Sequence, residues 1–99
     1  MTVVEVASID WIEASGNYVA INRDGERLIM RSTMKALEDS LPPETFVRVN
    51  RSSLVNLRRV VEVRKTDLGI HQVIVGKGIA LRLTMPVREF ERQLRFAAE

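Results

Sequence analysis

The β-prone segments of this chain are short and are separated by residues that form turns. The clearest turn is Asp24-Gly25, which lies between residues 18–23 and 27–31, two runs of mostly β-forming residues. Asp-Gly between two such runs is a strong signal for a two-residue β-hairpin, because both residues tolerate a positive φ. Further turn signals lie at 15–17, 69 and 76–78. This pattern predicts a mostly β fold with seven or eight short strands.

Two segments predict helices. Thr33 is a good N-cap, and the leucines at 37 and 41 recur at helical spacing before Pro42-Pro43 ends the segment. Near the C-terminus, Pro86 suits a first helical turn. It is followed by an apolar stripe at Val87, Phe90, Leu94 and Ala97. We therefore expect a short internal helix and a C-terminal helix within one domain that spans residues 1–99.

Composition excludes several classes of protein. The chain is 45% hydrophobic and 28% charged, which is typical of an ordered soluble domain. No apolar run approaches the roughly 20 residues that span a bilayer, and the N-terminus lacks a signal-peptide pattern. There are no cysteines, so disulfides and thiolate metal ligands are excluded. These features fit a cytoplasmic domain that makes no membrane contact of its own.

The sequence offers little for catalysis. Its single histidine, His71, lies on an expected strand next to Ile70 and is interpreted as a partly exposed strand residue. No histidines or carboxylates stand at metal-ligand spacing, and no serine has a convincing base. Gly76-Lys77-Gly78 lacks the spacing of a phosphate-binding loop, so a hairpin turn is the better interpretation. We expect no enzyme activity, no metal and no cofactor.

Charge is distributed unevenly along the chain. Residues 1–45 carry a net charge of −4, whereas residues 46–99 carry +6. The densest basic stretch is 46–65, in which Glu62 is the single acidic residue. Its basic residues are Arg48, Arg51, Arg58, Arg59, Arg64 and Lys65. Such a stretch attracts polyanions, although many solvated protein faces are equally basic.

Residues 46–57 combine apolar and polar side chains in an unusual way. If residues 46–50 are extended, Val47 and Val49 point inward, Phe46 is exposed or capped, and Arg48 and Asn50 point outward. Residues 51–53 then leave the strand before the chain returns to the core. We expect an anchored rim of arginine, asparagine and serine side chains.

The side chains of that rim can recognise DNA. Arginine can bond guanine bidentately, asparagine can do so to adenine, and serine can hold phosphates. The alternative is structural: asparagine and serine often satisfy the backbone of a turn, and Arg48 could pair with a carboxylate such as Glu13. The residues alone leave both interpretations open.

Three segments resemble one known family. Residues 9–19 (IDWIEASGNYV) resemble the D-I-x-x-I-E-A-x-x-N-Y-V opening of LytTR domains. Residues 46–56 (FVRVNRSSLVN) resemble that family's F-x-R-V-H-R-S-x-[IL]-V-N signature, and residues 31–38 resemble its strand end and short helix. The resemblance runs from about residue 3 to residue 94, and its central motif is long and specific.

The resemblance implies a DNA-binding output domain of bacterial transcription regulators, placed after a receiver or sensor domain. The implied fold is an elongated arrangement of small antiparallel β-sheets with short helices. Its loops enter successive major grooves of double-stranded DNA, often bending it, and two domains commonly bind direct repeats, with a homodimer on DNA as one arrangement. Bending costs on the order of 1–6 kcal/mol, which additional backbone contacts must offset.

The resemblance also implies which residues contact DNA. Arg51 occupies the main base-reading position, and Asn17 lies in the loop after the first motif. Two positions depart from the family: Asn50 replaces the usual histidine, and Met85 replaces an expected arginine, for which Arg88 could substitute. The full set of expected DNA-contacting residues is Asn17, Tyr18, Arg48, Asn50, Arg51, Ser52, Ser53, Asn56, Arg58, Arg59, Thr84, Met85 and Arg88.

Three other functions are alternatives to sequence-specific DNA binding. A β-rich interaction or dimerisation module that has lost DNA binding is favoured by Met85. A binder of RNA or single strands would need exposed aromatic residues for stacking, and the few aromatics here lie mostly in apolar patterns. An enzyme fits least well.

Overall fold

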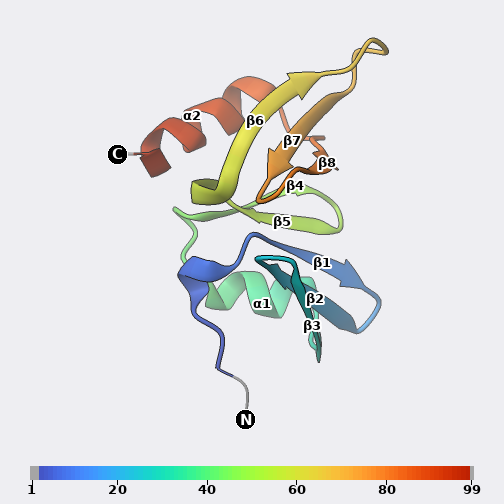
Figure 1. Cartoon of the computed structure of the whole chain (residues 1–99), viewed down its shortest axis with the longest axis vertical. Coiled ribbons are helices and arrows are strands. Elements are labelled where there is room, and N and C mark those ends of the chain that lie inside the picture. The colour runs from blue at the N-terminus through green and yellow to red at the C-terminus, as the bar shows by residue number, and fades with distance from the viewer. Residues whose placement is uncertain (1–2, 99) are drawn as a thin grey trace.

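The computed structural model describes residues 3–98, which form two antiparallel sheets, two α-helices and two short 3₁₀ helices (Figure 1). In chain order the elements are η1 (Val6–Ser8), β1 (Trp11–Ser15), β2 (Tyr18–Arg23), β3 (Glu26–Arg31), α1 (Met34–Ser40), β4 (Phe46–Asn50), β5 (Ser53–Asn56), η2 (Leu57–Arg59), β6 (Val60–Lys65), β7 (His71–Val75), β8 (Ile79–Arg82) and α2 (Val87–Ala98). The prediction of a mostly β chain with an internal and a C-terminal helix is confirmed.

The larger sheet has five strands in the order β3-β2-β1-β5-β4. The predicted hairpin at Asp24-Gly25 joins β2 to β3, and these two residues have φ values of 46° and 84°. A second hairpin, which the sequence did not predict, joins β4 to β5. Because β5 pairs with β1, this hairpin lies beside the one that β1 forms with β2.

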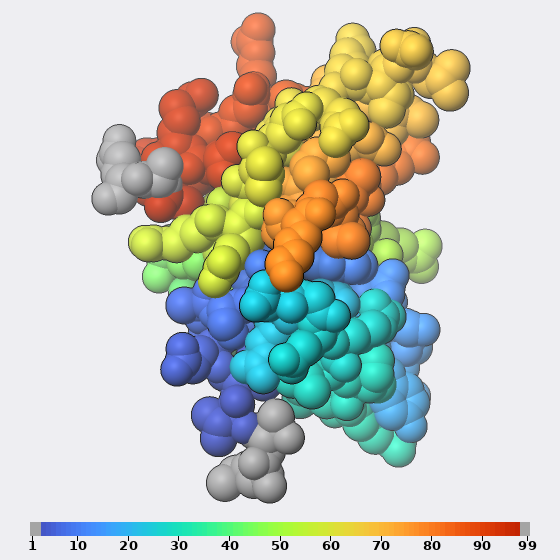
Figure 2. Space-filling view, viewed as in Figure 1, coloured from blue at the N-terminus to red at the C-terminus, as the bar shows by residue number. Residues whose placement is uncertain are grey.

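The smaller sheet contains β6, β7 and β8 in sequence order. The turn at residues 76–78 confirms the predicted hairpin between β7 and β8. That turn rests against the β2–β3 turn, where the Lys77 ammonium lies 3.3 Å from an Asp24 carboxylate oxygen; Figure 2 shows the two turns in contact. The two sheets are therefore joined at their turns as well as through the core.

The larger sheet is the middle layer of three. One face packs against α1 in a core cluster that includes Ile12, Leu54 and Met34. The opposite face packs against the smaller sheet and α2, around Trp11 and Phe90, and the apolar stripe predicted on the C-terminal helix lies in this second cluster. The molecule measures 42 × 30 × 23 Å, so the elongated arrangement is confirmed.

Two expectations about the central segment were wrong. Phe46 is 4% exposed, because β4 lies between two core layers: Phe46 faces α1 while Val47 faces the smaller sheet. The extended run expected over 57–65 begins with the 3₁₀ helix η2 instead, because the Asn56 side chain accepts a hydrogen bond from the Arg58 amide and turns the chain. In the described part of the chain, no helix is long and apolar enough to cross a membrane.

Candidate nucleic-acid interface

Three loops meet on one side of the molecule. They are the β1–β2 turn (residues 16–17), the β4–β5 turn (residues 51–52) and the β8–α2 loop (residues 83–86), which together we call the loop edge. In Figure 1, β1, the β4–β5 turn and the end of β8 all point to the right-hand side. The loop edge thus collects residues that are distant in sequence, including five of the thirteen predicted site residues: Asn17, Arg51, Ser52, Thr84 and Met85.

Backbone hydrogen bonds hold the β1–β2 turn against its neighbours. The Ala14 amide donates to the Ser52 carbonyl at 2.9 Å, and the Ser32 amide donates to the Asn17 carbonyl at 2.9 Å. Gly16 has a φ of 60°, a conformation that glycine adopts without strain. This framework leaves the Asn17 side chain exposed at the turn and Tyr18 half exposed beside it.

The β4–β5 turn is shaped by the Asn50 side chain. Its Oδ1 accepts from the Ser52 amide at 2.9 Å, and its Nδ2 donates to the Arg82 carbonyl at 2.7 Å. The strand register shifts between Arg48 and Asn50, which marks a β-bulge at this point. Asn50 therefore fixes the turn and ties it to β8, and the exposed Arg51 lies at the tip.

The β8–α2 loop is hydrogen-bonded to β4, the strand that leads into the β4–β5 turn. The Thr84 amide donates to the Val49 carbonyl at 2.8 Å, and the Thr84 hydroxyl donates to the same oxygen at 3.2 Å. Met85 is half-buried and packs against the core, while Arg88 is exposed in the first turn of α2. The third predicted contact region therefore presents Thr84 and Arg88 rather than the Met85 side chain.

The two arginines in the first half of α2, Arg88 and Arg92, differ in their contacts with acidic side chains. Glu89 accepts hydrogen bonds from Arg92 and Gln93, and chiefly the Arg92 bond holds the pKa of Glu89 below its usual range. The same pair raises the pKa of Arg92. Arg92 is thus engaged within the helix, whereas Arg88 has no carboxylate partner among the residues that the structure describes.

Two predicted site residues are buried. Ser53 is 5% exposed, and Asn56 is 1% exposed. The Asn56 Nδ2 donates to the Ile9 carbonyl at 2.9 Å, and its Oδ1 accepts from the Arg58 amide at 3.0 Å. Both hydrogen-bonding ends of Asn56 are thus occupied by backbone, which leaves no free side-chain surface for DNA.

Three predicted arginines lie away from the loop edge or carry partners. Arg48 Nε lies 3.2 Å from a carboxylate oxygen of Glu38 on α1. The contact is an ion pair and not a hydrogen bond, because its geometry leaves Nε without a hydrogen-bond acceptor. The sequence suggested Glu13 as the partner instead. Arg58 and Arg59 belong to η2, at the opposite end of β5 from Arg51. Arg59 forms an ion pair with Asp10, at 3.7 Å, and donates to the Ala7 carbonyl at 3.2 Å.

Part of the remaining positive charge lies at or beside the loop edge. Within residues 3–97, seven basic side chains have no carboxylate within 4.0 Å: Arg31, Arg51, Arg58, Lys65, Arg82, Arg88 and Arg95. Arg51 and Arg88 were predicted site residues. Arg31, which pairs in register with Tyr18, and Arg82, whose carbonyl binds Asn50, were missed. Only strand pairing brings these two arginines to the edge, so no local pattern identifies them.

The site has no feature of a metal centre. Among the described residues, no group of three or more histidine, cysteine or acidic side chains is arranged to hold a metal ion. The loop edge instead offers guanidinium, amide and hydroxyl groups on a braced backbone. Such donors suit a polyanionic partner.

Comparisons with known proteins agree with this architecture. The family model described as the LytTr DNA-binding domain matches residues 1–95. One solved structure with a similar fold is described as the LytTr DNA-binding domain of a methyl-accepting/DNA response regulator from Bacillus cereus. It is 17% identical, with a TM-score of 0.77, and the match covers 93% of this chain and 84% of that one. No curated protein matches the chain. The match over nearly the whole sequence shows that the chain belongs to the LytTr DNA-binding domain family.

Proposed function

We propose that this chain binds double-stranded DNA at a specific sequence and serves as the output domain of a transcription regulator. The observation that carries the proposal is the loop edge, where three loops are braced by hydrogen bonds and Arg51 lies at the tip of one of them. Arg31, Arg82 and Arg88 adjoin these loops, and like Arg51 they have no carboxylate partner among the described residues. Because an arginine that is already ion-paired must lose that pair before it can bind DNA, the unpaired ones are the natural ligands of phosphates and bases.

Arg51 is the residue that we assign to base reading. It lies at the tip of a two-residue turn, so its guanidinium can reach into a major groove that is about 12 Å wide. There it can bond the O6 and N7 atoms of one guanine. We assign Asn17, which is exposed on the neighbouring turn, to a second base step of the same groove.

The flanking residues hold the duplex in register. Thr84, Arg88 and the exposed Ser52 border the tip and offer hydroxyl and guanidinium donors to phosphates. Tyr18, half exposed beside Asn17, packs against the sugar-phosphate backbone. We omit Ser53 and Asn56 from the contacts because of their burial, and Met85 because it packs against the core.

Asn50 and Arg48 support the site from behind it. Both hydrogen-bonding ends of Asn50 are engaged within the protein, so we assign it to shaping the turn that carries Arg51. Arg48 is half-buried and paired with Glu38, so it adds to the local positive field. Arg58, which has no carboxylate partner among the described residues, contacts a phosphate where the duplex continues past the loop edge. Arg59 is paired with Asp10, so it adds to the local positive field.

The assembly on DNA follows the family. We propose that two copies bind direct repeats, each with its loop edge in the major groove, and that a receiver or sensor domain controls them. The similar solved structure belongs to a response regulator, which supports this context. The alternative is an interaction module without DNA binding, and the core-packed Met85 is the observation that favours it.

Selection from random duplexes at a stated salt concentration tests the proposed function. We expect the purified chain to enrich one short motif, and the motif to recur as a direct repeat in duplexes that bind two copies. The Arg95→Ala variant is the control: it also removes an exposed arginine, but one in the last turn of α2, so it should enrich the same motif as the wild type. A flat pool for both proteins would refute sequence-specific binding and support the interaction module.

A further inference from the structure

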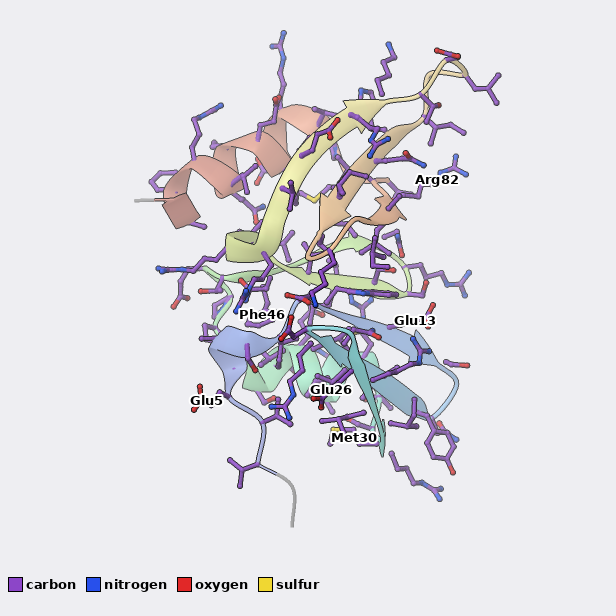
Figure 3. The ribbon with its side chains drawn as sticks, in the orientation of Figure 1. Glu5, Glu13, Glu26, Met30, Phe46 and Arg82 are labelled. Atoms are coloured by element: carbon purple, nitrogen blue, oxygen red, sulfur yellow. The ribbon has the colours of Figure 1, made fainter. Side chains whose placement is uncertain are left out.

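Arg82 is an exposed arginine at the end of β8. It has no carboxylate partner among the residues described by the structure, although Glu62, Glu89 and other acids lie on neighbouring elements. Figure 3 shows its side chain extending away from the ribbon on the side where β1 and the β4–β5 turn end. Its guanidinium N–H groups are therefore free of an ion pair with the described residues and can donate to a ligand.

The backbone at Arg82 is fixed on several sides. Its carbonyl accepts the 2.7 Å hydrogen bond from Asn50, and Arg82 pairs in register with Gln72 on β7. The neighbours Leu81 and Leu83 are both buried in the core, and the Leu83 amide donates to the His71 carbonyl at 2.9 Å. Alternation along the strand therefore points Arg82 outward from a backbone that is held by these hydrogen bonds.

The Asn50 bond also fixes Arg82 relative to Arg51. Asn50 Oδ1 holds the Ser52 amide of the turn whose tip is Arg51, while Nδ2 of the same side chain holds Arg82. One carboxamide thus links the turn that carries Arg51, in the larger sheet, to the backbone of Arg82, in the smaller sheet. The Thr84–Val49 hydrogen bond joins the two sheets nearby. With the backbone of both arginines fixed in this way, the two side chains can bind the same extended partner.

We infer that Arg82 binds a backbone phosphate of the duplex whose groove Arg51 enters, with Asn50 as the positioning residue that sets their spacing. The inference rests on the proposed function. A phosphate is the fitting ligand because Arg82 projects from a strand face beside the loops, and not from a loop tip. A side chain flanking an inserted turn meets the wall of the groove, which is made of phosphates.

The salt dependence of binding tests the inference. Each phosphate contact contributes about 0.9 to the slope of log K against log salt, which corresponds to about fivefold in affinity at 0.15 M. We expect Arg82→Ala to lower the slope by about 0.9 and to weaken binding about fivefold on selected and scrambled duplexes alike. Arg82→Lys keeps the charge and should keep the slope.

Arg95→Ala, the matched control, should change neither slope nor affinity, because Arg95 is also exposed and lies in the last turn of α2. An unchanged slope for Arg82→Ala would overturn the inference while leaving the proposed function intact, provided that the wild type still prefers its selected site. A loss confined to the selected site would overturn it too, because it would make Arg82 a base contact. If the wild type binds no duplex, the proposed function fails and the inference fails with it.

Asn50→Ala tests the positioning part separately. This change removes no charge, so the salt slope should stay within about 0.3 of the wild-type value, while affinity for the selected site falls about tenfold and scrambled duplexes are affected less. Retained affinity of Asn50→Ala for the selected site would refute the positioning role. Circular dichroism of each variant confirms that the fold is kept before binding is measured.

Discussion

Replacing Asn56 by alanine should unfold the domain more readily without changing which DNA it prefers. The side chain is 1% exposed and makes two hydrogen bonds to backbone, to the Ile9 carbonyl and from the Arg58 amide. Asn56 stands five residues after Arg51 in the motif that resembles the family signature. The two residues therefore separate a structural role from a binding role within one motif.

The expected loss of stability can be worked from those contacts. A hydrogen bond contributes about 0.5–1.5 kcal/mol net, and a buried partner left without one costs about 1–3 kcal/mol. The Ile9 residue is 3% exposed, so its carbonyl has little access to replacement water. We therefore expect Asn56→Ala to lower the free energy of unfolding by about 3 kcal/mol. For a domain of this size, that corresponds to a fall of about 12–24 °C in Tm.

The single tryptophan reports the transition. Trp11 is 9% exposed in the core between the two sheets, so its fluorescence follows urea unfolding directly. Arg51→Ala is the matched comparison and should stay within about 0.5 kcal/mol of the wild type, because Arg51 is exposed and unpaired. The reasoning is refuted if Asn56→Ala unfolds at the wild-type urea concentration, or if it loses sequence preference at a temperature where it is fully folded.

Two further predictions concern Gly76, in the β7–β8 turn, and Arg58, in η2. Gly76 and Gly16 have similar φ values, +56° and +60°, but a Cβ at Gly76 would lie 2.9 Å from an Asp10 carboxylate oxygen, whereas nothing lies within 4 Å at Gly16. In both alanine variants the free energy of unfolding should fall by about 1–2 kcal/mol, because alanine is strained in the left-handed conformation. In urea titrations Gly76→Ala should lose at least about 1 kcal/mol more, because its Cβ crowds Asp10. Equal losses in the two variants would mean that the Asp10 side chain moves aside at no cost. Arg58→Ala should weaken binding to selected and scrambled duplexes by the same factor and lower the salt slope by about 0.9, and an effect on only one duplex would reassign it to base reading.

The local elements could be predicted from the sequence because local residues determine them. Asp24-Gly25 tolerates the positive φ that the hairpin needs, and Thr33 supplies the oxygen that caps α1 by accepting from the Ala36 amide at 3.1 Å. The position of Phe46 could not be predicted in this way. Alternation assumes one buried face, whereas β4 is covered on both faces by layers that come from distant parts of the chain.

The candidate site was predictable only where exposure decides the role. Arg51 follows an apolar run and stays at the surface, as its residue type suggests. Asn50 and Asn56 are the same residue type in the same motif, yet both are engaged by backbone groups up to 47 residues away in sequence. Arg82 and Arg31 reach the loop edge only through strand pairing with residues of other motifs, which a sequence pattern does not contain.

The measurement that tests the central claim most directly is the ratio of affinities for the selected duplex and a scrambled duplex, at 0.15 M salt, for wild type and Arg51→Ala. A bidentate arginine–guanine contact is worth about 1–3 kcal/mol of discrimination, so Arg51→Ala should reduce that ratio by about 5- to 150-fold. Its affinity for the scrambled duplex should change far less. An Arg51→Ala ratio equal to that of the wild type would contradict the assignment of base reading to the loop edge.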